Sequence, residues 1–343
     1  MEKTLERQGD RLFYLDFLRA IASIAVIVMH ISIEDPNDSA LVFETIRYMT
    51  VGWCVPVFLM ITGTLFLYKD NCSFERVWKH IKKTFLIIVF WGFVYNFISL
   101  FLIEGFSMSI ITKSAKMIVL ADTTYCYQFW YLYALIPMYF LLPIFNEFVK
   151  NASKKEFTIV LVMFFVFTIV IPNIVKYTGD FGGALIDKFY QFKSFFFYML
   201  LGAYLKKYSF SKLISNVLLF ISFFVLLIAV ICGFSNININ LEGLYGYDSV
   251  YICVLSSAIY LIAKNRVSFT NFSKNVFGSI SKYSLGIYIF HVIIIQAFRK
   301  IIHFDSTFAP VYISVPVIVL CVLAVSFVAS FVAKKIPVIK KLV

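Results

Sequence analysis

An arginine and a histidine stand out in an apolar stretch near the start of the chain. Within residues 12–33, Arg19, His30 and Asp16 are the only charged or readily titrated side chains. At about 100° and 1.5 Å per residue, a helix brings Arg19 and His30 to within roughly 20° of each other and about 16 Å apart along its axis. A cation in a membrane span costs about 2.5 kcal/mol or more, so this shared face indicates a lined cavity rather than lipid. The pairing suggests an enzyme.

The composition predicts the elements that position these residues. Of the 343 residues, 61% are hydrophobic and 15% are charged, and the mean hydropathy is +0.87, which excludes a soluble globular protein. The apolar residues run continuously instead of alternating, so we expect helices rather than a β-barrel. An apolar run of about 20 residues spans the hydrocarbon core of a bilayer. We therefore predict an all-α polytopic membrane protein with about ten transmembrane helices, near residues 12–33, 49–68, 84–103, 129–146, 157–175, 191–205, 213–233, 250–263, 283–300 and 311–333.

The positions of lysine and arginine predict the orientation, because cytoplasmic loops retain these residues. If the N-terminus lies inside, the inner segments hold most of the 31 basic residues, so we expect both termini in the cytosol. The net charge of +12 is then largely a consequence of topology. Nucleic-acid binding is excluded, because the charge is spread over short loops and forms no basic folded face.

Each residue of the pair also has a purely structural interpretation. His30 is the best candidate for a general base, because a neutral imidazole takes a proton from a hydroxyl and returns it. Its alternative is a packing histidine bonded to a backbone carbonyl. Arg19 suits bidentate capture of a phosphate. Its alternative is an interfacial arginine paired with Asp16 one turn away, and these two interpretations are compatible.

A basic segment, residues 69–83, lies in the predicted inner loop between the second and third spans, and it reads KDNCSFERVWKHIKK. Such a segment holds either anionic lipid head groups or the phosphates and adenine end of a nucleotide-like cofactor. The candidates for cofactor binding are Arg76, Lys79, Lys82 and Lys83. We interpret His80 as a solvated loop residue.

Two further segments place polar and aromatic residues inside predicted spans. In the first, residues 128–145, Trp130 either lines a substrate path or only anchors the helix at the outer interface. In the second, residues 281–291, His291 lies at mid-span and either belongs to a pathway or packs. The six cysteines have no metal-binding spacing, and we expect no metal site.

The order and spacing of these pieces resemble the acyltransferase 3 family of membrane acyltransferases over almost the whole chain. The opening YLDFLRAIASIAVIVMH is similar to that family's first helix, in which an arginine and a histidine are separated by ten residues. Three later segments are also similar to segments of the family, namely VPVFLMITG at 55–63, FWYLYAL at 129–135 and SKYSLGIYIFH at 281–291. Two positions depart from the family pattern: Gln128 stands where many members have a histidine, and Thr62 replaces a common serine.

This resemblance implies a single transmembrane acyltransferase domain, residues 1–343, in a bacterial plasma membrane. It implies transfer of an acyl group, usually acetyl, from cytosolic acyl-CoA to a hydroxyl of a cell-envelope glycan or of its lipid-linked precursor. Acetyl-CoA or another acyl-CoA is then the co-substrate, and the glycan and membrane lipids are the partners. His30 becomes the essential histidine and Arg19 its partner, with Trp130 and His291 as weaker candidates for substrate binding.

Two other classes of function stay open. A transporter of the same fold, for an amino acid such as serine or for a glycan, would move its substrate without using acyl-CoA. An accessory subunit of a polysaccharide export complex would tolerate the loss of Arg19 and His30. If the chain is an acyltransferase, we favour direct transfer assisted by a general base, because the sequence shows no nucleophilic Ser or Cys triad. The alternative is an acyl-histidine intermediate.

Overall fold

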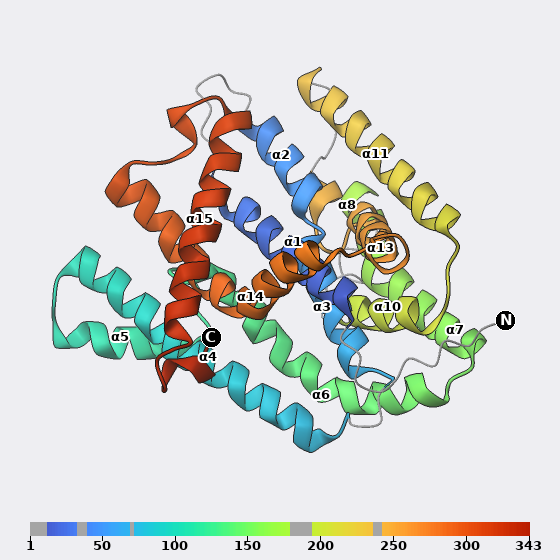
Figure 1. Ribbon diagram of the computed structural model, residues 1–343, viewed down its shortest axis with the longest axis horizontal. Coiled ribbons are helices and arrows are strands. Elements are labelled where there is room, and N and C mark those ends of the chain that lie inside the picture. The colour runs from blue at the N-terminus through green and yellow to red at the C-terminus, as the bar shows by residue number, and fades with distance from the viewer. Residues whose placement is uncertain (1–11, 33–39, 69–71, 179–193, 236–241) are drawn as a thin grey trace.

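The chain folds into a bundle of helices. The computed structural model describes residues 12–32, 40–68, 72–178, 194–235 and 242–343, and helices are the only regular secondary structure in these ranges (Figure 1). This part of the chain contains nine helical stretches that are long and apolar enough to cross a membrane: Phe13–His30, Phe43–Phe66, Phe74–Glu104, Tyr127–Asn151, Lys154–Ile174, Lys212–Phe234, Gly243–Asn265, Asn271–Ile302 and Val311–Ala333. The prediction of an all-α polytopic membrane protein is confirmed.

The sixth predicted span, residues 191–205, is represented by a shorter helix. Residues 191–205 were expected to cross the membrane, and the structure has α10 at Phe195–Lys207, with 13 residues that are mostly buried. The expected first residues of this span, 191–193, lie outside the described residues.

The helices of the first half are α1 (Phe13–His30), α2 (Ala40–Val51), α3 (Cys54–Phe66), α4 (Phe74–Glu104), α5 (Met108–Val119), η1 (Tyr127–Phe129), α6 (Trp130–Asn151) and α7 (Lys154–Phe165). They are followed by η2 (Val166–Val170), α8 (Ile171–Thr178), α10, α11 (Lys212–Phe234), α12 (Glu242–Tyr245), α13 (Val250–Asn265), α14 (Asn271–Ala297), η3 (Phe298–Ile302), η4 (Ser306–Phe308), α15 (Val311–Ala333) and η5 (Ile339–Lys341).

Helix α1 occupies the middle of the bundle, where it contacts α2, α3, α13, α14 and α15 (Figure 1). Small buried residues, Ala20, Ala22, Ser23 and Ala25, lie in the middle of the helix, and larger ones such as Leu18 and Ile27 lie on either side of them. Alanine side chains let neighbouring helices approach closely, which suits a helix with partners on every side. Because α1 is enclosed by protein, its polar residues face other helices and cavities instead of lipid.

Two glycines make the crossing of α3 and α10 unusually close. A Cβ atom on Gly63 would lie 1.9 Å from the carbonyl oxygen of Met199, and one on Gly202 would lie 2.1 Å from the carbonyl oxygen of Met60. The two backbones therefore touch, as in membrane helix pairs built on small residues. The crossing fixes α3, which forms one wall of the site described below.

Two segments predicted as loops are largely helical. Helix α4 begins at Phe74 because the Ser73 hydroxyl accepts the backbone N–H of Arg76, and Glu75 in the first turn complements the helix dipole. The described basic residues of segment 69–83, Arg76, Lys79, Lys82 and Lys83, thus lie on the first turns of a 31-residue helix.

Helix α2 begins within the predicted outer loop 34–48, of which residues 34–39 lie outside the described residues. Its two charged residues, Glu44 and Arg47, lie three positions apart and form an ion pair on one face of the helix. Because the two charges pair with each other within α2, the segment that contains them can form a helix that packs against the bundle.

Candidate active site

Two cavities meet at His30. The first, which we name the basic cavity, has a volume of about 530 Å³ and includes among its lining residues Arg47, Tyr48, Tyr127, Gln296, Arg299, Lys300, Asp305 and Ser306. The second, the aromatic cavity, has a volume of about 300 Å³ and includes Phe58, Trp130, Tyr131, Tyr139 and Tyr288 together with Arg19, His80 and Lys83. Met29, His30 and Tyr247 line both cavities. A molecule in either cavity can therefore reach the same imidazole.

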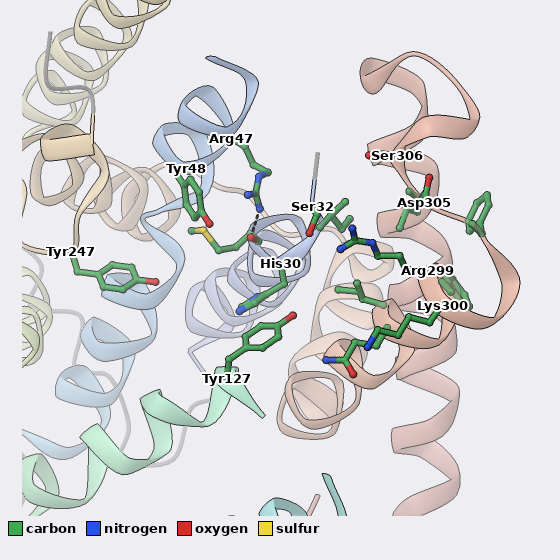
Figure 2. Close-up of a pocket in the computed structure, with 17 residues that line it drawn as sticks. His30, Ser32, Arg47, Tyr48, Tyr127, Tyr247, Arg299, Lys300, Asp305 and Ser306 are labelled. Atoms are coloured by element: carbon green, nitrogen blue, oxygen red, sulfur yellow. Dashed lines mark hydrogen bonds between the residues drawn. The ribbon is translucent and has the colours of Figure 1, made fainter. Parts of the chain in front are cut away.

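The position of His30 follows from the end of α1. His30 is the last residue of the helix, and Ile31 after it is already extended, so the ring lies where the helix opens. Figure 2 shows His30 beside Tyr127, with Arg47 on one side and Arg299 and Lys300 on the other. The His30 and Tyr127 rings stack with their centroids 5.2 Å apart.

Hydrogen bonding prepares His30 to act as a base. Its Nδ1 lies 2.8 Å from the carbonyl oxygen of Val26, which can only accept, so Nδ1 carries the proton. In the neutral ring the lone pair is then on Nε2. A general base needs a free lone pair and a partner that orients the ring, and the Val26 carbonyl oxygen is that partner here.

Arg19 lines the same aromatic cavity as His30, three helical turns earlier on α1. Its Nη1 donates to the Ser281 hydroxyl at 3.1 Å, and this hydroxyl donates to Asp16 at 2.6 Å. Asp16 also forms an ion pair with Arg19, with 3.8 Å between Nη1 and Oδ1. The structural and functional interpretations of Arg19 thus coexist: the guanidinium is oriented by α1 and α14 and still borders the cavity.

Trp130 and His291 differ in their relation to the cavities. Trp130 lines the aromatic cavity and stacks on Tyr247 with ring centroids 5.6 Å apart. His291 is fully buried and lines neither cavity in the described part of the chain. Its ring packs edge-on against His30 at 5.0 Å, and its Nδ1 donates to the carbonyl oxygen of Tyr288 at 2.7 Å. Within the described residues, His291 therefore packs against the His30 ring and has no contact with either cavity.

Of the four basic residues predicted to bind a cofactor, one lines a cavity. Lys83 borders the aromatic cavity. Lys79 is exposed and pairs with Glu75 at 2.8 Å. The other two cations, Arg76 and Lys82, lie over the rings of Phe66 and Trp78, respectively.

The interpretation of His80 as a solvated loop residue is wrong. His80 lies on α4, is half-buried and lines the aromatic cavity. Its ring packs edge-on against Phe66 at 4.9 Å, and its Nδ1 bonds the carbonyl oxygen of Arg76 one turn earlier. The helical start of α4 turns this side chain inward.

Sequence reasoning missed Arg47. Its side chain is 7% exposed, lines the basic cavity and donates to the carbonyl oxygens of Val28 and Met29 at the end of α1. It also pairs with Glu44. Arg47 thus satisfies free carbonyl groups at the end of the helix that carries His30. The available signal was a glutamate and an arginine three residues apart within the mostly apolar stretch ALVFETIRYMTV.

Two groups near the cavities have pKa values that bear on the chemistry. Burial raises the pKa of the Cys126 thiol to about 12, so this cysteine beside η1 is no thiolate nucleophile at neutral pH. In the basic cavity, hydrogen bonds from Thr307 lower the pKa of Asp305 below its ordinary value, so this carboxylate stays ionised.

The fold and the site together define a class: a polytopic membrane protein with a half-buried histidine that two cavities reach. The family model described as an acyltransferase domain, that of the acyltransferase 3 family, matches residues 12–335. The chain therefore belongs to the acyltransferase 3 family of membrane acyltransferases, which confirms the resemblance drawn from its motifs. No curated protein and no solved structure matches the chain.

Proposed function

We propose that the chain is a bacterial plasma-membrane O-acetyltransferase that uses cytosolic acetyl-CoA to esterify a hydroxyl of a cell-envelope glycan or its lipid-linked precursor. The observation that carries this proposal is the position of His30 in the walls of both cavities. A transfer between two separate substrates needs one base that both of them can approach, and proximity of the reacting groups supplies much of the rate.

The properties of the aromatic cavity suit the donor. Acyl-CoA is a polyanion with a thin arm that ends in the thioester. The cavity is at the small end of ligand pockets, which favours the arm over the nucleotide. Arg19 and Lys83 add positive charge away from His30, where they would attract the phosphates.

The properties of the basic cavity suit the acceptor. Tyrosine hydroxyls, Arg299 and Ser306 offer hydrogen-bond donors and acceptors around a larger space, as a sugar with several hydroxyls requires. The VPVF form of segment 55–63 is similar to the enterobacterial common antigen O-acetyltransferase, which favours an envelope glycan as the acceptor.

The proposed reaction is a direct transfer. The acceptor oxygen attacks the thioester carbonyl carbon while Nε2 of His30 takes the hydroxyl proton. The carbon–sulfur bond then breaks, and the CoA sulfur leaves with the proton that His30 returns. The products are an ester and free CoA. Tyr127, stacked on the imidazole, and His291 behind it hold the ring in place.

The test is His30→Asn, paired with His303→Asn as a control. Asparagine keeps a short donor near the Val26 carbonyl but has no titratable nitrogen at the Nε2 position. His303 is exposed and has a left-handed backbone that asparagine tolerates. We expect His30→Asn to lower acetyl transfer to envelope glycan by about 10²–10⁴-fold, measured by mass spectrometry of glycan and by release of free CoA thiol. Unchanged transfer would reject the base.

The transporter alternative predicts a different outcome. In sealed proteoliposomes it would move serine or glycan across the membrane without consuming acetyl-CoA. Substrate flux without thiol release would replace the acyltransferase proposal.

A further inference from the structure

Gln128 is a buried polar residue at the edge of the aromatic cavity. It lies in η1, is 1% exposed and lines the cavity that His30 also lines. Among the described residues, neither Nε2 nor Oε1 of its side chain makes a hydrogen bond. Leaving a buried amide unpaired costs about 1–3 kcal/mol. Such a group inside a cavity wall indicates a ligand that pairs with it.

The backbone around Gln128 is fixed. Its carbonyl oxygen accepts the Tyr288 hydroxyl at 2.5 Å, and the next residue, Phe129, donates its N–H to Cys126 at 2.8 Å. Its neighbour Tyr127 stacks on His30, and Trp130 lines the cavity. The amide is therefore held close to the proposed base by a rigid turn.

Tyr95 is the polar side chain that interacts with Gln128, and it leaves the amide incompletely paired. The Tyr95 hydroxyl donates its single proton to the carbonyl oxygen of Ile289 at 2.6 Å and accepts the Ile293 N–H at 3.2 Å. It has no proton left for the amide oxygen, and it can accept at most one of the two N–H groups. One N–H of Gln128 is thus free for a ligand.

We propose that this N–H of Gln128 donates to the thioester carbonyl oxygen of the acyl donor as that oxygen becomes negatively charged. The inference rests on the proposed function. When the acceptor oxygen bonds to the carbonyl carbon, the electron pair of the C=O bond moves to the oxygen, and His30 holds the hydroxyl proton. The electron pair returns as the carbon–sulfur bond breaks, and the sulfur takes that proton.

A carboxamide suits this task in a membrane. It is a neutral donor, so no charge needs to be buried before the substrate arrives. A fixed donor aimed at a developing oxyanion stabilises the transition state more than the ground state.

The experiment compares Gln128→Leu with Asn96→Leu. Asn96 is fully buried and both its amide atoms are also without a hydrogen bond among the described residues, but it lines neither cavity. The purified protein is tested in proteoliposomes with acetyl-CoA and envelope glycan from cells that lack the gene. We expect Gln128→Leu to lower kcat by about 10²–10³-fold with little change in KM for acetyl-CoA, and Asn96→Leu to retain kcat.

Stability separates this role from a structural one. Replacing an unpaired buried amide by a similar apolar side chain is neutral or stabilising, so the melting temperature of Gln128→Leu should stay the same or rise. Gln128→Met keeps the length of the side chain but has no N–H group, and it should lose kcat as well.

The inference is overturned if Gln128→Leu or Gln128→Met keeps wild-type kcat, or if only KM for acetyl-CoA rises. It is also overturned if both variants fail to fold or melt well below the wild type, which would mark Gln128 as structural. If the wild type consumes no acetyl-CoA, the proposed function itself fails and this inference falls with it. If the wild type transfers acetyl groups and Gln128→Leu is equally active, the inference about Gln128 fails while the proposed function stands.

Discussion

The crossing of α3 and α10 makes a sharp prediction about stability. We expect Gly63→Ala to destabilise the protein strongly, although alanine is ordinarily favoured over glycine in a helix by about 1 kcal/mol. The new Cβ atom would lie 1.9 Å from the Met199 carbonyl oxygen, whereas ordinary contact begins at 3.4 Å. The difference between these two distances is 1.5 Å, and α3 and α10 would need to separate by that much.

The size of the effect follows from what resists this separation. The clash is with backbone atoms of α10, which cannot rotate away as a flexible side chain would. Met60 and Met199 beside the crossing are fully buried, so a shift disrupts packing on both helices. Overpacking a core costs about 1–3 kcal/mol, and a backbone clash belongs at the upper end. With an unfolding entropy of about 2.1 cal/mol/K per residue over 343 residues, a loss of about 3 kcal/mol lowers the melting temperature by roughly 4 °C.

The chain offers a matched control in Gly92→Ala on α4. A Cβ atom there would meet only Ile118 Cγ1, at an ordinary 3.5 Å. Melting of the detergent-purified protein, followed by size-exclusion chromatography after heating, measures both variants. We expect Gly92→Ala to melt at or above the wild-type temperature, while Gly63→Ala melts several degrees lower. Equal melting of the two variants would refute the claim that backbone contact holds these helices together.

Three further predictions concern the donor path, Arg47 and the topology. Lys83→Ala should raise the Kd for acetyl-CoA about tenfold, whereas Lys79→Ala, which removes an exposed residue paired with a glutamate, should leave it unchanged in a binding titration. Arg47→Met should destabilise the protein by about 1–3 kcal/mol, because it removes a buried guanidinium that donates to the carbonyl oxygens of Val28 and Met29 and pairs with Glu44, and a normal melting temperature would contradict this. After the native cysteines are replaced, single cysteines at Asp122 and Asn151 should be labelled from opposite sides of the membrane, and labelling from the same side would overturn the predicted orientation.

Local patterns in the sequence were enough to predict the helical bundle and the central pair of residues. Continuous apolar runs carry the information for spans, because lipid leaves no other way to satisfy the backbone. The shared face of Arg19 and His30 follows from helix geometry alone, and both residues line one cavity. The basic segment 69–83 was found, but its helical start was not, so His80 was assigned to solvent.

Contacts between distant parts of the chain could not be predicted in this way. The partner of Arg19 is Ser281, 262 positions away, and nothing in either segment indicates the other. The orientation prediction sums the basic residues between spans, and this sum places Arg47 in an outer loop. In the structure the guanidinium of Arg47 is instead buried against α1. The η1 turn depends on the Tyr288 hydroxyl from α14, so the burial of Gln128 was also beyond local reasoning.

The buried polar groups around His30 differ in a way that bears on function. Asp16 and Arg19 satisfy each other through Ser281, and Arg47 satisfies a helix end, so these groups stabilise the fold without a ligand. Among the described residues, the side chain of Gln128 is incompletely paired, and it lies on the wall of the cavity that also reaches His30. Asn96 is also a buried amide without a hydrogen bond among the described residues, but it lines neither cavity, so an unpaired group alone does not identify a ligand site. What distinguishes Gln128 is the combination of an incompletely paired amide with a place in the wall of a cavity that His30 also lines.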